Sequence, residues 1–163
     1  MQVGEQTVGN HYQLPLPLRE VEPMLPDNKA MALKRLKSVR NRLHRDVEYK
    51  NNYVSFMSSM ISRGQAQVVD PEKDVPKGWK WFIPHHGVYH PKTRKFRIVM
   101  DCSAQHEGRS LNAELLQGPD TTNLLLGVLL RFCQYAVPFM GDLEQMYYQI
   151  YVPENQRSLL RFL

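Results

Sequence analysis

A single carboxylate, Asp142, lies between two short apolar stretches in the segment AVPFMGDLEQMYYQIYV, residues 136–152. The apolar residues at 137–140 predict a short strand, and those at 150–152 predict a second strand once 144–149 have turned the chain. Rigid strand ends are where β-sheet enzymes hold metals or phosphates. An isolated aspartate after a strand is nevertheless more often a cap or turn residue.

Three histidines and a cysteine form a second cluster of reactive side chains, at His85, His86, His90 and Cys102. Imidazole and thiolate are preferred zinc ligands. Their spacing matches no paired-ligand pattern, and His85 and His86 on one strand would point to opposite faces. Packing and hydrogen bonding at the base of a hairpin is therefore the better interpretation.

Cationic side chains are concentrated in two segments of a chain whose net charge is +5. Residues 29–50 hold eight Lys or Arg against two acids, and residues 73–97 hold seven against one. Such segments favour contact with a polyanion, of which phosphate backbones are the commonest. There are two alternative explanations for the basic segments. The first could be a solvated helix surface, and the second a hairpin edge whose cations protect it from aggregation.

Two helices are expected to carry the first basic segment. A stop and cap at 26–28 predict a helix that begins at Lys29. Asp46 predicts the cap of a second helix that ends near Gly64, although the two could form one bent helix. Apolar residues at helical spacing give the first helix one buried stripe, made of Ala32, Leu36, Val39 and Leu43.

The second basic segment is expected to form a β-hairpin. Residues 79–83 and 94–100 read as its strands, with a basic turn at 90–93. Residues 103–120 read as irregular. Asp120 or Thr121 then predicts the cap of an apolar helix through about Phe132, packed under the strand that delivers the aspartate. The side expected to be buried consists of Leu124, Leu125, Val128, Leu129 and Phe132.

Length and composition set the broad class. With 163 residues, 42% of them hydrophobic, the chain can bury one core, as one domain or a piece of one. Residues 1–20 lack the order of a signal peptide, and no apolar run approaches the roughly 18 residues of a membrane helix. Two cysteines favour free thiols in a reducing compartment. We expect an intracellular protein, in a cytoplasmic particle or the nucleus, that is not secreted.

Eight short blocks follow one another in a characteristic order. They are YQLPLP at 12–17, MAL with RL at 31–36, PHHGV at 84–88, RIVMDCSA at 97–104, SLN at 110–112, LQGPD at 116–120, the apolar run at 126–132, and 142–152. The ordered set resembles the amino-terminal part of the reverse transcriptase of retroelements, closest to the Pol polyprotein of BEL/Pao-type LTR retrotransposons. This resemblance covers nearly the whole chain.

The resemblance implies a catalytic role for the opening aspartate. Asp142 matches the first catalytic carboxylate of the palm, which would bridge two Mg²⁺ about 4 Å apart. The backbone carbonyl of Leu143 would be an additional ligand. Such a metal pair would activate the primer 3′-hydroxyl and neutralise charge on the incoming triphosphate.

Nucleotide and template contacts follow from the same resemblance. Tyr147 matches an aromatic residue that lies against the sugar of the dNTP and disfavours a 2′-hydroxyl. Arg97 matches the fingers arginine that lies over the incoming base and pairs with its phosphates. Gln117 lies in a segment near the template. The hairpin turn offers a further phosphate contact from Lys92, Arg94 or Lys95, among which the sequence does not choose.

One departure from the family limits these expectations. Its second catalytic motif, Tyr-x-Asp-Asp, is missing, since no adjacent Asp pair occurs in the sequence. A single carboxylate cannot hold the metal pair, so the chain alone should not polymerise. The apolar run at 159–163 reads as a strand that lacks its neighbours, which favours a truncated fragment.

The sequence therefore predicts an α+β, incomplete reverse-transcriptase-like fold. An extended leader with four prolines at 1–27 would precede a fingers-like region at 28–135 and the start of the palm at 136–163. Its partners would be primer–template, dNTP and the remainder of the Pol polyprotein, without a membrane. The alternatives are a non-catalytic nucleic-acid-binding module retained from a retroelement, or an interaction protein acting through its helices.

Overall fold

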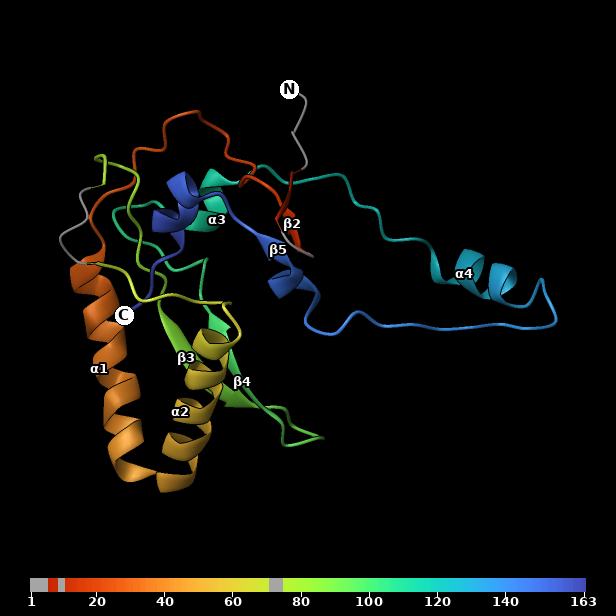
Figure 1. The fold of residues 1–163 in the computed structure, drawn as a ribbon, viewed down its shortest axis with the longest axis horizontal. Coiled ribbons are helices and arrows are strands. Elements are labelled where there is room, and N and C mark those ends of the chain that lie inside the picture. The colour runs from red at the N-terminus through yellow and green to blue at the C-terminus, as the bar shows by residue number, and fades with distance from the viewer. Residues whose placement is uncertain (1–5, 9–10, 71–74) are drawn as a thin grey trace.

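The computed structural model describes residues 6–8, 11–70 and 75–163. Helices and strands are mixed along the chain, as the α+β prediction requires at its coarsest level. Figure 1 shows a body of helices, a hairpin and short strands, from which one segment that contains a helix extends outward. Lys73 of the second basic segment lies outside the described residues.

The two amino-terminal helices form separately, as α1 (Lys29–Arg45) and α2 (Val47–Ser62). Between them Asp46 is extended, with φ −125° and ψ 100°, so they are not one bent helix. Its side chain accepts a hydrogen bond from the Tyr49 backbone N–H at 2.9 Å, which confirms the predicted cap. Gly64, at φ 69°, follows the end of α2 as expected.

The stop and cap predicted at 26–28 are present, and Asp27 supplies the side-chain acceptor. Asp27 accepts a hydrogen bond from the Lys29 backbone N–H at 3.0 Å, whereas the Asn28 side chain makes no capping bond. The Asn28 amide is instead fully buried and bridges both backbone groups of Phe82, at 2.7 and 2.8 Å. This asparagine thus fixes the start of α1 to a segment 54 residues away.

The hairpin consists of β3 (His85–Tyr89) and β4 (Phe96–Met100), antiparallel with His85 opposite Met100 and Tyr89 opposite Phe96. The prediction of a first strand at 79–83 was wrong. That stretch pairs elsewhere, because the backbone N–H groups of Trp81 and Ile83 donate to carbonyls of Ser158 and Arg161. Propensity identified an extended segment but could not identify its partner.

The leader is attached to the body through a small sheet. β1 (Gln6–Val8) pairs antiparallel with β2 (His11–Gln13), which pairs in parallel with β5 (Ile150–Tyr151). The extended leader therefore lies along another part of the chain, as predicted. Its prolines follow β2, where no ladder hydrogen bond is lost.

Two clusters of buried side chains form the core. One joins the leader, the segment before β3 and the carboxyl-terminal segment, through Leu25, Trp81, Ile83, Leu111 and Leu159. The other lies between the helices and the hairpin and consists of Val39, Tyr49, Tyr53 and Ile98. The half-buried side chain of Met100 packs against both.

Leu159 and Leu160 belong to the first cluster. Of the strand expected at 159–163, only Arg161 forms a β-bridge, in parallel with Phe82. Residues Glu154–Leu160 form the 3₁₀ helix η2, and the Leu159 side chain is 0% exposed. Phe162 packs edge-on against the His85 ring, with ring centroids 5.5 Å apart. Residues 103–120 contain one short helix, α3 (Leu111–Glu114), within the irregular region that was expected.

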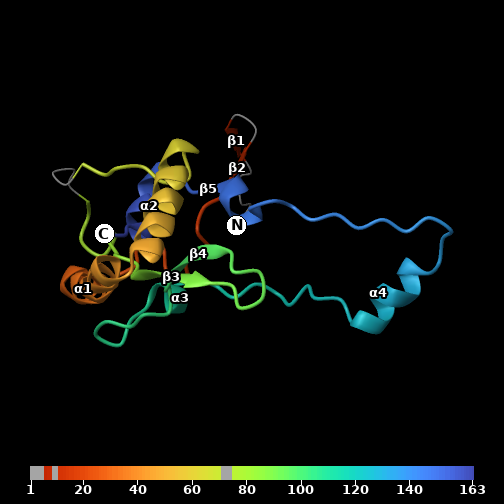
Figure 2. The same cartoon turned by 90° about the horizontal axis from the view of Figure 1, so that it is seen from below.

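The extending segment overturns a further expectation. Its helix, α4 (Leu125–Phe132), begins later than predicted, and no side chain caps its start. The Asp120 carboxylate instead accepts a hydrogen bond from the Thr122 backbone N–H at 2.9 Å. No strand forms at 137–140, where Phe139 is 91% exposed. The five residues expected on a buried side are exposed too, and Figures 1 and 2 show α4 standing away from the body. Nothing in the described part of the chain covers this apolar helix.

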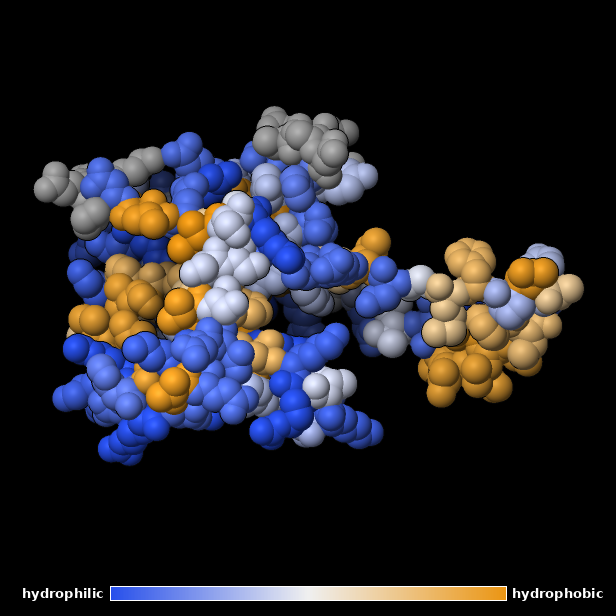
Figure 3. Space-filling model, turned by 60° about the horizontal axis from the view of Figure 1, so that its bottom comes forward, coloured by the Kyte–Doolittle hydropathy of each residue, from blue (hydrophilic) through white to orange (hydrophobic). Residues whose placement is uncertain are grey.

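We call residues 121–145 the arm. Figure 3 shows its apolar surface as a separate lobe beside the mainly polar body. The sequence contains no apolar run of the length expected for a membrane helix. Within the described ranges, no helix is both long and apolar enough to span a bilayer.

Candidate nucleotide and nucleic-acid site

The hairpin has one buried face and one exposed face. His85 and Gly87 of β3, with Ile98 of β4, are buried toward the helices, whereas Arg97 and Val99 are exposed. This alternation follows from the two-residue period of a strand. Arg97 therefore projects from the outer face of β4.

Gly87 fixes the hairpin against α2. The Tyr49 hydroxyl accepts a hydrogen bond from the Gly87 N–H at 2.8 Å and approaches its carbonyl at 3.3 Å. A Cβ at this position would collide with the Phe96 ring and the Tyr49 hydroxyl. Only glycine permits this close approach of the strand backbone to the helix.

The turn of the hairpin is organised by His90. Its Nδ1 accepts hydrogen bonds from the backbone N–H groups of Lys92 and Thr93, at 3.3 and 3.1 Å. Its backbone carbonyl accepts a bond from the Arg94 N–H at 2.9 Å. Arg94 adopts φ 57°, a left-handed conformation that is uncommon for a non-glycine residue.

The turn presents its cations to solvent. Lys92, Arg94 and Lys95 are exposed, as is Arg97 two residues farther along β4. The Arg94 guanidinium lies 5.4 Å from the centroid of the Tyr89 ring. No carboxylate of the described residues pairs with any of these four side chains. They form an unneutralised basic edge, which we call the hairpin edge.

The base of the hairpin carries a buried polar contact instead of a metal ligand set. His85 Nε2 and the Tyr53 hydroxyl lie 2.5 Å apart. Burial lowers the pKa of His85, partly opposed by a hydrogen bond to the Ile83 backbone, and burial followed by Tyr49 raises the pKa of Tyr53. The pair is therefore neutral near pH 7.

The zinc hypothesis has no geometric support. His85 is buried and His86 is exposed on the opposite face, while His90 is engaged in the turn. Burial followed by the nearby Asp101 raises the pKa of Cys102, which disfavours the thiolate that zinc needs. The interpretation as packing and hydrogen bonding holds for His85.

Asp142, Leu143 and Tyr147 lie at the returning end of the arm. Asp142 is exposed, and no hydrogen bond or ion pair joins it to any described residue. Leu143 is 70% and Tyr147 is 82% exposed, the latter within the 3₁₀ helix η1 (Met146–Gln149). Gln65 donates a hydrogen bond to the Gln145 side chain at 2.7 Å, which attaches this end of the arm to the loop after α2.

The predicted residues thus occupy two places. The four cations share the hairpin edge, and Asp142, Leu143 and Tyr147 share one segment of chain. Among the described contacts, none joins the two groups, and Figures 1 and 2 draw the arm apart from β4. Gln117 lies exposed at the start of the chain that leads to the arm.

The oxygen donors around Asp142 do not by themselves complete a two-magnesium site. Mg²⁺ is usually bound through one or two carboxylates together with substrate phosphates, and a metal pair needs shared carboxylates. Asp142 supplies one carboxylate. A backbone oxygen donor nearby, the carbonyl of Glu144, accepts a hydrogen bond from the Gln149 side-chain amide at 3.4 Å. In the described ranges no three His, Cys, Asp or Glu side chains converge on a common point. No catalytic step follows from these residues alone.

Asp101, within the block at 97–104, links the hairpin to α1. Arg35 pairs with its carboxylate at 2.9 Å, and the Ser103 hydroxyl donates to it at 2.7 Å. The Ser103 hydroxyl, followed by Arg35, lowers the pKa of Asp101 below its usual range. In the sequence, an acidic residue directly after a predicted strand, in a chain with a basic helix, is the signal that could have indicated this ion pair.

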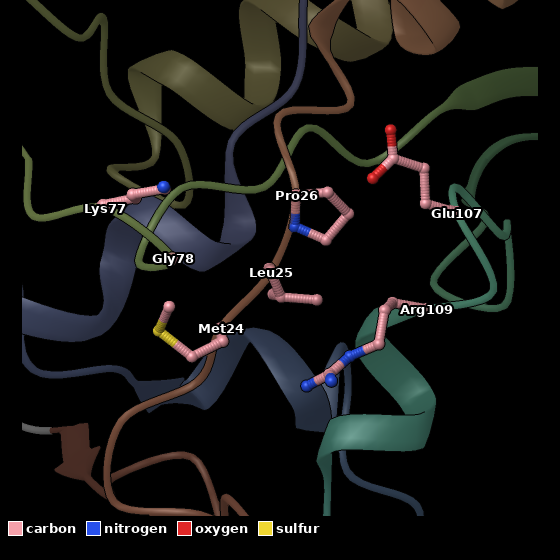
Figure 4. Close-up of a pocket in the computed structure, with 7 residues that line it drawn as sticks. All are labelled: Met24, Leu25, Pro26, Lys77, Gly78, Glu107 and Arg109. Atoms are coloured by element: carbon pink, nitrogen blue, oxygen red, sulfur yellow. The ribbon is translucent and has the colours of Figure 1, made fainter.

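A cavity of about 330 Å³ lies away from all predicted site residues. Figure 4 shows the leader residues 24–26 in the middle of its lining, with Lys77 and Gly78 to one side and Glu107 and Arg109 to the other. Arg109, whose side chain is partly exposed, pairs with the buried Glu114 at 2.8 Å. Lys77 and Glu107 are the other charged residues that line the cavity.

Comparisons of this chain with protein-family models, with curated proteins and with solved structures find no match.

Proposed function

We propose that the chain is the fingers and early palm part of a retrotransposon reverse transcriptase, resembling the BEL/Pao-type Pol polyprotein. In the complete enzyme this part would bind primer–template and dNTP, and Asp142 would be one of the magnesium ligands. The α+β arrangement and the ordered sequence blocks are compatible with this function. By itself the chain would bind nucleic acid without extending a primer.

The hairpin edge carries the proposal. It combines four exposed cations with no carboxylate partner among the described residues. Hydrogen bonds join Gly87 to Tyr49 and the turn to His90, and so organise the backbone that carries these cations. Exposed cations close together on a turn and the adjoining strand are suited to phosphate groups, and guanidinium groups bind phosphate in a bidentate manner.

The test is binding of a fluorescein-labelled RNA–DNA primer–template by the 163-residue chain, followed by anisotropy over a range of KCl concentrations. Replacing Lys92, Arg94, Lys95 and Arg97 by Ala should weaken binding and make the slope of log K against log salt about 3 to 4 less steep. Binding that is unaffected by these replacements would refute the proposal.

A matched control removes four exposed cations outside the hairpin edge and α1, namely Lys50, Arg63, Lys77 and Arg131. It should change the slope much less. Primer extension with Mg²⁺ and dNTPs should be undetectable for every variant, and EDTA should leave binding unchanged because the metal site is incomplete. Extension by the chain alone would overturn the argument from the single carboxylate.

A further inference from the structure

The outer face of α1 is a second strongly basic surface of the described residues, apart from the hairpin edge. The helix holds seven Lys or Arg and no Asp or Glu in 17 residues. Its apolar stripe includes the buried Ala32 and Val39, and α1 packs against α2 and β3. All seven cations are exposed, at positions 29, 34, 35, 37, 40, 42 and 45.

Two of the seven cations have partners in the body. Arg35 pairs with Asp101 at 2.9 Å, and the Arg42 guanidinium lies 4.0 Å from the centroid of the Tyr49 ring. Within the described part of the chain, no carboxylate pairs with the other five. Lys34, Lys37 and Arg45 lie opposite the apolar stripe, given 3.6 residues per turn.

The helix keeps this charge at an energetic cost. Lys34 and Lys37 are like charges at i,i+3, as are Lys37 and Arg40, and such pairs repel each other on a helix surface. Lys29 adds a positive charge at the amino terminus, where the helix dipole already disfavours one, and the first turn contains no acid. A bound polyanion would remove all of these repulsions together.

The length of the charged surface indicates the class of polyanion. Lys34, Lys37, Arg40 and Arg45 span about 16 Å of the helix axis, at about 1.5 Å per residue. One strand of a nucleic-acid duplex carries one phosphate per about 3.4 Å of its axis, so an extended run of about five phosphates matches this length. A membrane fits less well, because the apolar stripe that would enter lipid is buried against the body.

We propose that the outer face of α1 is a second, sequence-independent nucleic-acid surface that follows a phosphate backbone, separate from the hairpin edge. This goes beyond the proposed function, which concerns the nucleotide and template contacts at the hairpin. Lys34, Lys37 and Arg45 on this face, with Arg40 on its flank, are its main phosphate contacts. Arg35 has a structural role through Asp101 and is left unchanged in the test.

The experiment measures the salt dependence of duplex binding by the 163-residue chain and by the variant K34Q/K37Q/R40Q/R45Q. We expect the variant to bind at least tenfold more weakly at 100 mM KCl, with a slope about 3 to 4 less steep. The control K50Q/R63Q/K77Q/R131Q makes the same change in net charge at other exposed positions. Equal effects of the two variants would overturn the proposal.

Further measurements separate the remaining outcomes. Circular dichroism should show that the α1 variant keeps its helices, and its melting temperature at low salt should rise because like-charge repulsion is relieved. Polyglutamate or phosphatidylserine vesicles that displace the duplex at equal charge concentration would reject nucleic acid as the partner. If the α1 variant loses binding and the hairpin variant does not, the proposed function is refuted and the α1 surface is supported. If the hairpin variant loses binding and the α1 variant does not, the α1 surface is refuted and the proposed function is supported.

Discussion

The buried His85–Tyr53 contact shows how one residue joins three parts of the chain. His85 begins β3, its ring is hydrogen-bonded to Tyr53 of α2, and Phe162 packs edge-on against it from the carboxyl-terminal segment. Protonation of His85 would place a charge within this buried contact. The residue therefore makes the stability of the body dependent on pH.

We predict that the free energy of unfolding falls as the pH is lowered from about 7.5 toward 5.5. Burial holds the pKa of His85 below its ordinary value near 6.5, so the unfolded chain binds a proton first. The loss begins as the pH passes the unfolded pKa and ends once it is below the folded pKa. Urea unfolding at several pH values measures it.

The variant His85→Gln should remove this part of the pH dependence. His86→Gln, at the exposed neighbouring position, is the matched control and should retain it. If both variants and the wild-type chain share one pH dependence, His85 is not its source.

At the scale of elements, α1 and α2 are fixed in place by different side-chain interactions. The start of α1 is fixed by Asn28 and Asp27, and its middle by the Arg35–Asp101 pair. The start of α2 depends on one side-chain cap, Asp46, which also ends the preceding helix. Replacing this residue therefore tests the junction between the two helices.

Replacing Asp46 by Ala should lower the free energy of unfolding by about 1 kcal/mol, because the Tyr49 backbone N–H loses its acceptor. Chemical denaturation measures the change. Asp46→Asn keeps a capping oxygen and should cost much less. Equal losses for the two variants would show that the charge of Asp46, rather than the cap, stabilises this junction.

At the scale of the whole molecule, the chain is divided into a body with a continuous core and an arm without one. Leu159 is 0% exposed in the body, whereas Leu130 is 65% exposed on α4. The two leucines have the same side chain and differ in surroundings. They therefore give a direct comparison of the two parts.

We expect Leu159→Ala to cost about 2 to 5 kcal/mol of unfolding free energy, since it leaves a cavity beside Trp81 and Leu111. Leu130→Ala should change it by less than about 0.5 kcal/mol, as for other exposed positions. Thermal and urea unfolding measure both. A large loss from Leu130→Ala would show that the arm packs against something in solution.

The sequence alone determined the features that depend on local patterning. The start of α1 at Lys29, the cap at Asp46, the hairpin turn near His90 and the opposite faces of His85 and His86 all follow from spacing and capping within a few residues. Fold class at the level of mixed α and β was also predicted. The roles of Asp142, Arg97 and Tyr147 stay predictions, because they come from a family resemblance.

Only the tertiary structure decided the pairings between distant segments. Residues 79–83 bond to the carboxyl-terminal segment instead of β4, Asn28 bridges Phe82 instead of capping a helix, and β5 joins the leader. The apolar periodicity of α4 correctly indicated a helix but not what would cover it. A pattern fixes which face of an element is apolar, whereas burial requires a partner whose position depends on the rest of the chain.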